Sequence, residues 1–370
     1  MNTIIDIKQN NYQNIYRLFF QYDKVSKQQI ARFLNLSLPT VVNNIGKLNK
    51  EGKIRECGQL ESQGGRPAIA YELVKDAHIA IAVEIQNTQI KCAVLNLLGE
   101  IMLQKNSEFT FIEEQSYTLT LIQAIDQFIT ESRYAKSQIL GIGLSVQGIA
   151  AKDGKSMLYS KAFPSDNFDI PTLDNHFDLP VMLFHDVKCA ATAELWKAKY
   201  LNDAIYVFIS EHLGGAHIIN NQIDLGKNGF AGAFEHLQIY DNGNACYCGQ
   251  KGCLETYCSL SALLQKNESE EQFFAQLRQK DFHYQQRWDI FLTNLAKGLN
   301  AVYLLLERDI ILGGKIAPYL KDEDLVVLKQ KMESYATFPQ HDLNISIAQQ
   351  QSYSTLIGAG LYFIKKGLRK

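Results

Sequence analysis

Residues 229–259, GFAGAFEHLQIYDNGNACYCGQKGCLETYCS, hold three cysteines within eight positions of a glycine-rich segment. Cys246, Cys248 and Cys253 follow the spacing C-x-C-x4-C. Three thiolates that converge in a tight loop suit a tetrahedral zinc ion, which needs one further ligand. The nearest candidate is His236, ten residues before Cys246. The alternative is that the thiols stay reduced and pack within the loop.

The composition is that of an ordinary globular chain. Its 370 residues include 37 Lys and Arg and 39 Asp and Glu, and this length allows two or three domains. No apolar run approaches the roughly 20 residues that a membrane helix needs, and the first residues lack the pattern of a secretory signal. Seven cysteines, an odd number with three clustered, favour metal binding in a reducing compartment over disulfides. We therefore expect a cytoplasmic protein with no membrane partner.

The charge is unevenly distributed along the chain. Residues 1–74 hold ten Lys and Arg and six Asp and Glu, a net charge of +4, whereas the whole chain carries −2. A basic segment in front of an acidic body indicates that the front segment meets a polyanion. Chance unevenness explains this distribution of charge about equally well. The motif within the segment therefore has to decide whether the segment binds a polyanion.

Two short predicted helices follow one another in this segment. Ser26 is a good N-cap for the first helix, and Asn35 and Leu36 form the turn before the second. The polar residues on the outer face of the second helix are Ser37, Thr40, Asn43, Asn44 and Lys47. Such side chains can contact base edges or phosphates in a major groove. The arrangement is that of a helix-turn-helix, and the alternative is a helical hairpin with a solvated face.

A predicted β-hairpin follows the two helices. Strand-like IRECG and AIAYEL flank the loop ESQGGRP, which presents Arg66 on a narrow, extended backbone at Gly64–Pro67. An arginine in such a segment can enter the minor groove, where the potential is negative. Residues 1–74 are therefore predicted to form a winged helix-turn-helix that binds double-stranded operator DNA, with a recognition helix over about residues 37–49.

The rest of the chain alternates strands and helices. HIAIAVEIQNTQIKCAVLN opens its first half with two strands and a turn, and AIYVFISEHLGGAHIINNQID opens its second half in the same way. The pattern predicts a mixed α/β sheet in each of two lobes, residues 75–190 and residues 191–370. Ligands of such proteins usually bind between the lobes, at strand ends.

The cysteine-rich segment is similar to the signature of the ROK family of repressors and sugar kinases. With the N-terminal helices and the GGRP loop, it resembles the family's transcriptional-regulator branch, typified by xylose and N-acetylglucosamine repressors, over nearly the whole chain. The resemblance implies an actin-like, hexokinase-like fold in two lobes, with the C-terminal helix returning to lobe 1, and assembly as a homodimer or tetramer. It also implies a zinc ion bound by His236, Cys246, Cys248 and Cys253, which is structural because four protein ligands leave no position for water.

The resemblance further implies a sugar pocket between the lobes. In FHDVKCAATAE, Asp186 matches an aspartate that grips sugar hydroxyls and serves the kinases as general base, and His185 stands where asparagine is usual. Glu255 matches a carboxylate that accepts hydrogen bonds from the sugar, and His236 lies close to the ligand. The alternative for Asp186 and Glu255 is a capping or surface carboxylate.

The chain departs from the family pattern just before His236. The usual Gly-Glu-x-Gly-His is GAFEH at residues 232–236, so a sugar-contacting carboxylate is missing at Ala233. Glu235 either restores the contact from a neighbouring position, marks a pocket for a different ligand, or has a structural role only.

The phosphate-binding turns of the family's kinases are also altered. Their Asp-x-Gly-Gly-Thr is EIQNT at residues 84–88, so Gln86 and Asn87 replace the glycines that let a backbone approach phosphates. In the second glycine-rich turn, Glu211 adds negative charge near a nucleotide. We therefore expect that the protein is not an enzyme.

The sequence predicts a DNA-binding transcriptional repressor of carbohydrate-metabolism genes, controlled by a sugar or sugar phosphate bound between the lobes. Two alternatives stay open. One is a sugar kinase with an appended DNA-binding domain, and the other is a repressor that answers a protein partner. Neither the identity of the sugar nor the direction of its effect on DNA binding follows from the sequence.

Overall fold

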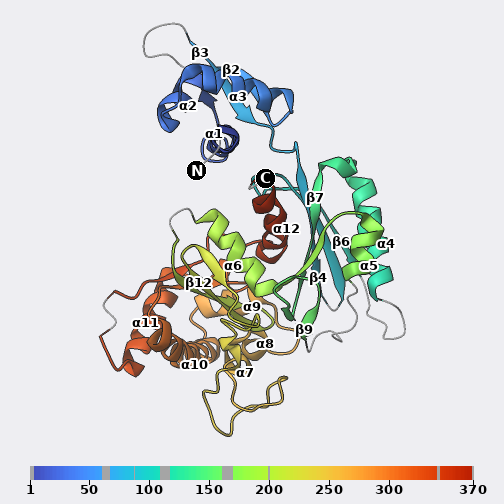
Figure 1. The fold of residues 1–370 in the computed structure, drawn as a ribbon. Helices are drawn as coiled ribbons and strands as arrows, with labels where there is room; N and C mark the ends of the chain where they lie inside the picture. Colours follow the sequence, from blue (N-terminus) through green and yellow to red (C-terminus); the bar gives the residue numbers. More distant parts are fainter. Residues whose placement is uncertain are drawn as a thin grey trace.

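The computed structural model of the protein describes residues 4–60, 67–86, 88–108, 117–160, 170–198, 201–339 and 342–368. They form a small N-terminal unit followed by two five-stranded sheets with helices on their faces (Figure 1). Within these ranges, no helix combines the length and the apolar character that crossing a membrane requires.

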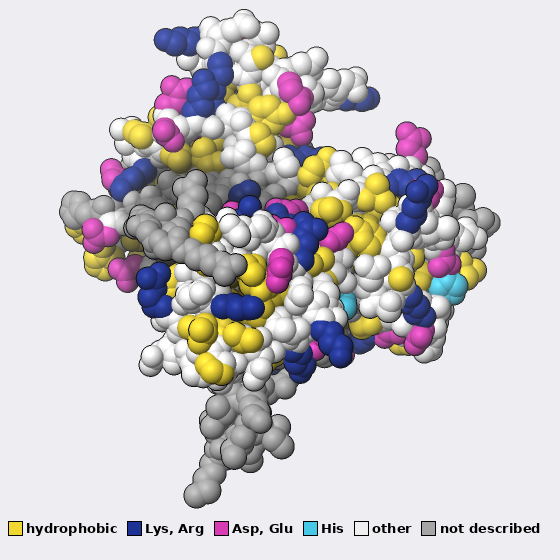
Figure 2. Space-filling view, turned by 90° about the horizontal axis from the view of Figure 1, so that it is seen from above, with side chains coloured by type: hydrophobic (Ala, Val, Ile, Leu, Met, Phe, Trp, Pro, Cys, Tyr) yellow, Lys and Arg dark blue, Asp and Glu magenta, His cyan; other side chains and the backbone are white. Residues whose placement is uncertain are grey.

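Three helices and a small sheet make up the N-terminal unit. They are α1 (Ile4–Leu18), α2 (Lys27–Leu34), α3 (Leu38–Lys50), β1 (Val25–Ser26), β2 (Ile54–Leu60) and β3 (Ala68–Leu73), with the antiparallel strand order β1-β3-β2. Ser26 caps α2 and Ser37 caps α3, at the positions that the sequence predicts. Val41, Ile45 and Leu48 are buried, so the apolar stripe of α3 faces inward and its polar side faces out. Figure 2 shows the molecule from above, and basic and acidic side chains are interspersed over the face that is seen.

Each of the two larger sheets is mixed. The strands of the first, in the order β10-β7-β4-β5-β6, are β10 (Val181–His185), β7 (Ile139–Val146), β4 (Ile79–Ile85), β5 (Gln89–Leu95) and β6 (Ile101–Glu108). Those of the second, in the order β13-β12-β11-β14-β15, are β13 (Gln222–Asp224), β12 (Leu213–Ile219), β11 (Ala204–Ile209), β14 (Ile310–Gly313) and β15 (Ile345–Ile347).

The two sheets share one pairing pattern. In the first, β4 pairs antiparallel with β5 and parallel with β7, and β7 pairs parallel with β10. In the second, β11 pairs antiparallel with β12 and parallel with β14, and β14 pairs parallel with β15. Each of the two sheets therefore begins with an antiparallel hairpin, as the sequence predicts, and its last two strands along the chain pair in parallel.

Helices cover both faces of each sheet. The outer face of the first sheet packs on α4 (Tyr117–Ser132) and α5 (Ile170–Phe177), and that of the second on α9 (Glu270–Arg278), α10 (Phe282–Leu306) and α11 (Asp322–Tyr335). Between the sheets lie α6 (Asp186–Lys197) and α12 (Ser354–Gly367), which pack on one another (Figure 1). Because α12 contacts β4 and β7, the helix nearest the C-terminus covers the inner face of the first sheet.

The contact between α12 and α6 depends on glycine. A Cβ atom added at Gly358 of α12 would lie 1.8 Å from the carbonyl oxygen of Cys189 in α6. No side chain fits at that distance, so glycine lets the two backbones touch. Gly358, in the sequence LIGAGLY, therefore serves the packing of α12 against α6.

Candidate ligand pocket and metal centre

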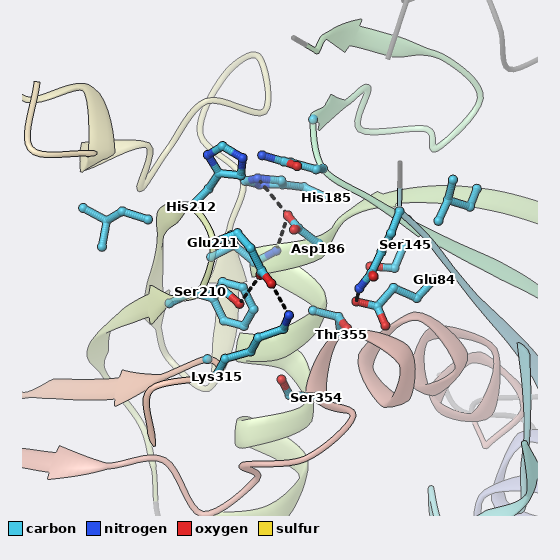
Figure 3. A pocket seen from close by; sticks show the side chains of 18 of the residues that line it. Glu84, Ser145, His185, Asp186, Ser210, Glu211, His212, Lys315, Ser354 and Thr355 are labelled. Carbon is cyan, nitrogen blue, oxygen red and sulfur yellow. Dashed lines mark hydrogen bonds and ion pairs between the residues drawn. The ribbon is translucent and has the colours of Figure 1, made fainter. Parts of the chain in front are cut away.

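A cavity of about 810 Å³ opens where the parallel strands of both sheets end. Its wall includes residues at or just after the carboxyl ends of these strands, namely Gln86, Gln147, His185, Ser210 and Gly314. Ligands of α/β sheets bind at this edge because the loops that follow parallel strands converge there. Figure 3 shows side chains from the two sheets and from α12 facing the same space.

His185 and Asp186 lie at the junction of β10 and α6. The Nε2 atom of His185 is 3.4 Å from Oδ1 of Asp186, and the same oxygen accepts a 2.8 Å hydrogen bond from the Val187 N–H (Figure 3). Burial lowers the pKa of His185 to about 3, so its imidazole is neutral at pH 7. Its Nδ1 atom is buried and has no hydrogen-bond partner in the part of the chain that the structure describes.

Burial also raises the pKa of Asp186 from 3.8 to about 7, with a smaller contribution in the same direction from Glu84. The folded protein therefore holds a proton on this carboxyl at pH values where the unfolded chain has lost it. The contribution of this carboxyl to the free energy of unfolding is most favourable below about pH 4, and it declines as the pH rises through 7.

Replacing this carboxyl with an amide removes the ionisation and keeps the shape. We expect Asp186→Asn to raise the free energy of unfolding by up to about 4 kcal/mol near pH 8.5, and by much less near pH 4.5. Calorimetric melting at the two pH values measures the difference. Asp178→Asn, at an exposed carboxylate, is the matched control and should show no such pH dependence. An equal gain for Asp186→Asn at both pH values would contradict the raised pKa.

Glu235 reaches the same cavity from a short 3₁₀ helix, Phe234–His236. The side chain is buried, and this burial raises its pKa to about 8. Its Oε2 atom has no hydrogen-bond partner among the described residues. Ala233, where the family pattern has the missing carboxylate, is not part of the wall. A buried carboxyl oxygen without a partner is costly unless a ligand supplies one.

Glu255 lies behind the wall rather than in it. Its Oε2 accepts a 2.5 Å hydrogen bond from the Leu213 N–H, and its Oε1 lies 2.8 Å from Nδ1 of His212. The side chain of His212 lines the cavity, and the hydrogen bond to Glu255 raises the pKa of that imidazole. The resemblance implies a ligand contact for Glu255, whereas the structure places His212 on the cavity wall; a histidine in a glycine-rich turn was the available sequence signal.

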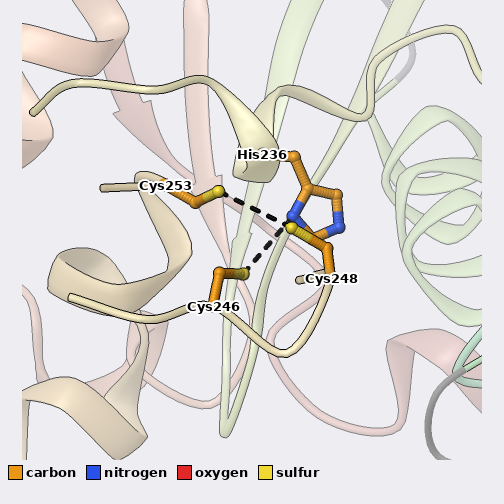
Figure 4. A group of neighbouring side chains, drawn as sticks. All are labelled: His236, Cys246, Cys248 and Cys253. Carbon is orange, nitrogen blue, oxygen red and sulfur yellow. Dashed lines mark hydrogen bonds between the residues drawn. The ribbon is translucent and has the colours of Figure 1, made fainter. Parts of the chain in front are cut away.

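Four side chains converge beside the cavity in a group that we call the His–Cys cluster. Its members are His236, Cys246, Cys248 and Cys253, and their ligand atoms all lie within 4.8 Å of one another (Figure 4). The Sγ atoms of Cys248 and Cys253 are 3.7 Å apart, as are Sγ of Cys246 and Nδ1 of His236. Bonds of about 2.3 Å from zinc to sulfur place two thiolates of a tetrahedron about 3.8 Å apart, so the cluster fits the ion.

The loop that carries these cysteines is shaped by its glycines. Gly252 has a φ of +75°, and a Cβ atom there would lie 1.6 Å from the carbonyl oxygen of Tyr240. Between the cysteines, Tyr247 reaches the cavity wall and meets the rings of His212 and His236 edge-on, with centroids 5.4 and 5.3 Å away. The loop of the His–Cys cluster therefore contributes a side chain to the cavity, and no motif in the sequence marks Tyr247 for this position.

The turns that correspond to phosphate-binding turns carry ion pairs. Glu84 accepts a 3.0 Å hydrogen bond from Gln86 and lies 3.4 Å from the ammonium of Lys91. Glu211 pairs with Lys315, directly after the Gly313-Gly314 turn (Figure 3). Asn87 lies outside the described residues.

The predicted DNA-contacting residues are differently placed on α3. Asn43 and Lys47 are exposed, whereas Thr40 bonds the capping hydroxyl of Ser37 at 2.8 Å and Asn44 donates to the Thr40 carbonyl at 2.8 Å. Lys47 also lies 3.9 Å from Glu51 and stands over the ring of Tyr12, so four of the five side chains have a partner within the N-terminal unit. Arg66, predicted at the tip of the hairpin, lies outside the described residues.

Comparison with known proteins shows the family to which the body of the chain belongs. The sequence model of the ROK family matches residues 80–366. The chain belongs to the ROK family. It is 28% identical over 262 residues to the xylose repressor of Caldicellulosiruptor bescii, 28% over 270 residues to the xylose repressor of Bacillus subtilis, and 27% over 263 residues to the dual regulator NagC of Escherichia coli. These alignments cover 70, 72 and 70% of this ROK chain and 66, 70 and 65% of the relatives, so the chain spans just under two thirds of the first and third.

Solved structures show the same ROK fold. A ROK family transcriptional regulator, a homologue of the E. coli MLC protein, matches with a TM-score of 0.78 and 20% identity over 98% of this chain and 96% of its own. A ROK glucokinase from Streptomyces griseus, solved with glucose and AMPPNP, matches with a TM-score of 0.65 and 19% identity over 77% of this chain and 98% of its own. Regulators and kinases therefore share the two-sheet body of this ROK protein.

Proposed function

We propose that this ROK protein is a transcriptional repressor of carbohydrate-metabolism genes that binds operator DNA through residues 1–74. A sugar or sugar phosphate bound between the lobes, residues 75–190 and 191–370, would control it. The observation that carries the proposal is the combination of a capped helix pair with an exposed polar face and a ROK body whose cavity holds unpartnered buried polar atoms. The names of the xylose repressors and of NagC support the same reading.

The DNA-binding unit is proposed to be a winged helix-turn-helix, with α3 in the major groove and the hairpin of β2 and β3 as the wing. Asn43 and Lys47 are the exposed candidates for base and phosphate contacts, and Arg66 is the candidate for the minor groove. A palindromic operator would bind a homodimer, or two dimers of a tetramer, in the cytoplasm.

Asn43→Ala should weaken binding to a selected operator by roughly tenfold and leave non-specific binding unchanged, because a lost base contact costs about 1–3 kcal/mol. Fluorescence anisotropy with an operator obtained by in vitro selection, and with a scrambled duplex, measures both affinities. Asn49→Ala, an exposed asparagine at the end of the same helix, is the control and should preserve the ratio of the two affinities. Wild-type discrimination by Asn43→Ala would remove this residue from the interface.

In the sugar pocket, we propose that Asp186, His185, Glu235 and His236 contact the ligand. Glu255 would act through His212, which it holds by the hydrogen bond to Nδ1. Glu235 would replace the carboxylate missing at Ala233. Hydroxyl groups both donate and accept hydrogen bonds, so they can satisfy neutral His185 and the free oxygen of Glu235 together.

The His–Cys cluster is proposed to hold a structural zinc ion. Bound there, zinc would fix the loop of Tyr247 against the cavity by joining it to His236. Four protein ligands leave no open position, so the ion would stabilise the fold and take no part in chemistry.

A sugar kinase with an appended DNA-binding unit is the second candidate, and we propose that it does not apply. Glu84 is engaged by Gln86 and Lys91, and Glu211 by Lys315, in the turns where a kinase needs bare backbone for phosphates.

The proposal is tested by measuring operator affinity with and without a panel of sugars and sugar phosphates. A ligand that changes operator affinity at least about tenfold is expected. Failure of in vitro selection to yield any preferred duplex would contradict DNA recognition. A preferred duplex with no response to any sugar would instead favour control by a protein partner.

A further inference from the structure

We infer that the cavity selects an uncharged, polyhydroxylated sugar and rejects the phosphate ester of the same sugar. The inference rests on the proposed function, since it narrows the class of effector that the same cavity takes. It follows from the signs and the pairing of the charges on the wall.

The wall of the cavity is acidic. Six of its side chains are carboxyl groups, and they are Glu84, Asp186, Glu211, Glu235, Glu270 and Glu271. Among the described residues that line the cavity, the lysines are Lys91 and Lys315, and there is no arginine. A phosphate ester carries up to two negative charges, so its binding in this space depends on cationic partners.

Neither lysine is free to neutralise a phosphate. The ammonium of Lys91 lies 3.4 Å from Glu84, and both side chains are mostly buried. The ammonium of Lys315 pairs with Glu211 (Figure 3). A phosphate could recruit either lysine only by displacing its carboxylate, which would leave that carboxylate without its partner.

Among the described helices of eight or more residues, three begin at the cavity wall, namely α6, α9 and α12, and helix N-termini favour anions. That of α9 carries two carboxyl groups of its own, Glu270 and Glu271. That of α6 already has an anionic partner, because Asp186 accepts a hydrogen bond from the Val187 N–H. That of α12 faces the cavity at Ser354 and Thr355. A helix terminus is equivalent to about half a unit charge, whereas a phosphate ester carries up to two, so this terminus alone does not neutralise the ester.

The groups that lack partners suit hydroxyls instead. Nδ1 of His185 and Oε2 of Glu235 are both buried without a hydrogen-bond partner among the described residues. Neither atom belongs to a cationic group when His185 is neutral. Hydroxyl groups donate to such atoms without bringing a net charge, and they leave the two ion pairs of the wall intact.

Isothermal titration calorimetry of the full chain tests the inference. Xylose, glucose, mannose and N-acetylglucosamine, together with maltose and cellobiose, are each compared with a phosphate ester of the same sugar. We expect the sugar that binds to do so at least about tenfold more tightly than its ester. An ester that binds as tightly as its sugar, or more tightly, would overturn the inference and leave sugar control intact. Binding of no compound, with operator binding preserved, would contradict sugar control and the inference with it.

A charge variant separates repulsion from simple lack of space. Glu211→Gln frees Lys315 and removes one negative charge, so the affinity for the ester should rise about tenfold relative to that for the sugar. Glu131→Gln is the matched control, because Glu131 forms a similar ion pair with Lys105 outside the cavity. An unchanged ratio of affinities in Glu211→Gln would show that the wall charges do not set the selectivity.

Discussion

Replacing Cys253 with serine should remove zinc from the protein and lower its free energy of unfolding by on the order of 5 kcal/mol. Cys253 is 1% exposed, and its Sγ lies 3.7 Å from that of Cys248, so no other side chain can take its place in the His–Cys cluster. A serine hydroxyl is a poor zinc ligand, and three remaining ligands hold the ion far more weakly. Elemental analysis for zinc per chain and calorimetric melting measure the two effects.

Cys258→Ser is the matched control for this prediction. Cys258 is also fully buried, five residues further along the chain, but it lies outside the His–Cys cluster. The control should keep one zinc per chain and lose stability only through the poorer packing of a hydroxyl. Wild-type protein that is purified without chelators and contains no zinc would refute the metal site itself. Full zinc occupancy in Cys253→Ser would remove Cys253 from the set of ligands.

The second large effect is expected at Asp186. Asp186→Ala should weaken effector binding by roughly tenfold to a hundredfold, because leaving a buried hydrogen-bonding group of the ligand without its partner costs about 1–3 kcal/mol. Operator affinity without effector should stay at the wild-type value, since Asp186 lies in the cavity at the start of α6 and not in the N-terminal unit. The variant would therefore still bind the operator but would no longer release or change that binding when the effector is added.

Calorimetry with the effector and anisotropy with the operator separate the two functions of this variant. Asp178→Ala, at an exposed carboxylate paired with Lys136 outside the cavity, serves as the control and should respond normally. A variant at Asp186 that keeps wild-type effector affinity would exclude this carboxyl from the pocket. Loss of operator affinity as well would indicate a general folding defect, which melting curves would reveal.

Much of the fold could be predicted because its signals are local. Ser26 and Ser37 cap helices through residues three positions away, and short runs of apolar residues mark the strands that open both hairpins. The His–Cys cluster was equally visible, since three of its members lie within eight positions. The family resemblance supplied the α/β ROK fold of the body, and the family match and the ROK structures confirm that fold.

The pocket could be predicted only in part, because the role of a carboxyl group depends on what folding places beside it. Glu255 lies 43 residues from His212 in the sequence, and the bond between them turns a predicted ligand contact into a support for another side chain. Glu211 and Lys315 are 104 residues apart, so their pairing gives no local pattern. Tyr247 belongs to no recognisable motif, and it lies on the cavity wall because the cysteines on either side of it are held in the His–Cys cluster.

The place of α12 between the layers has a consequence for how the chain is made. β7 ends at Val146 and α12 begins at Ser354, about 200 residues later. Synthesis at about 5–20 residues per second takes roughly 10–40 s to cover that distance, and during this time the inner face of the first sheet lacks the larger part of its native cover, which α12 provides. The N-terminal unit, complete by Leu73, has emerged long before. During synthesis on the ribosome, the unit proposed to bind DNA is therefore completed first. A chaperone that binds exposed apolar surface would act on the first sheet until α12 has been synthesised.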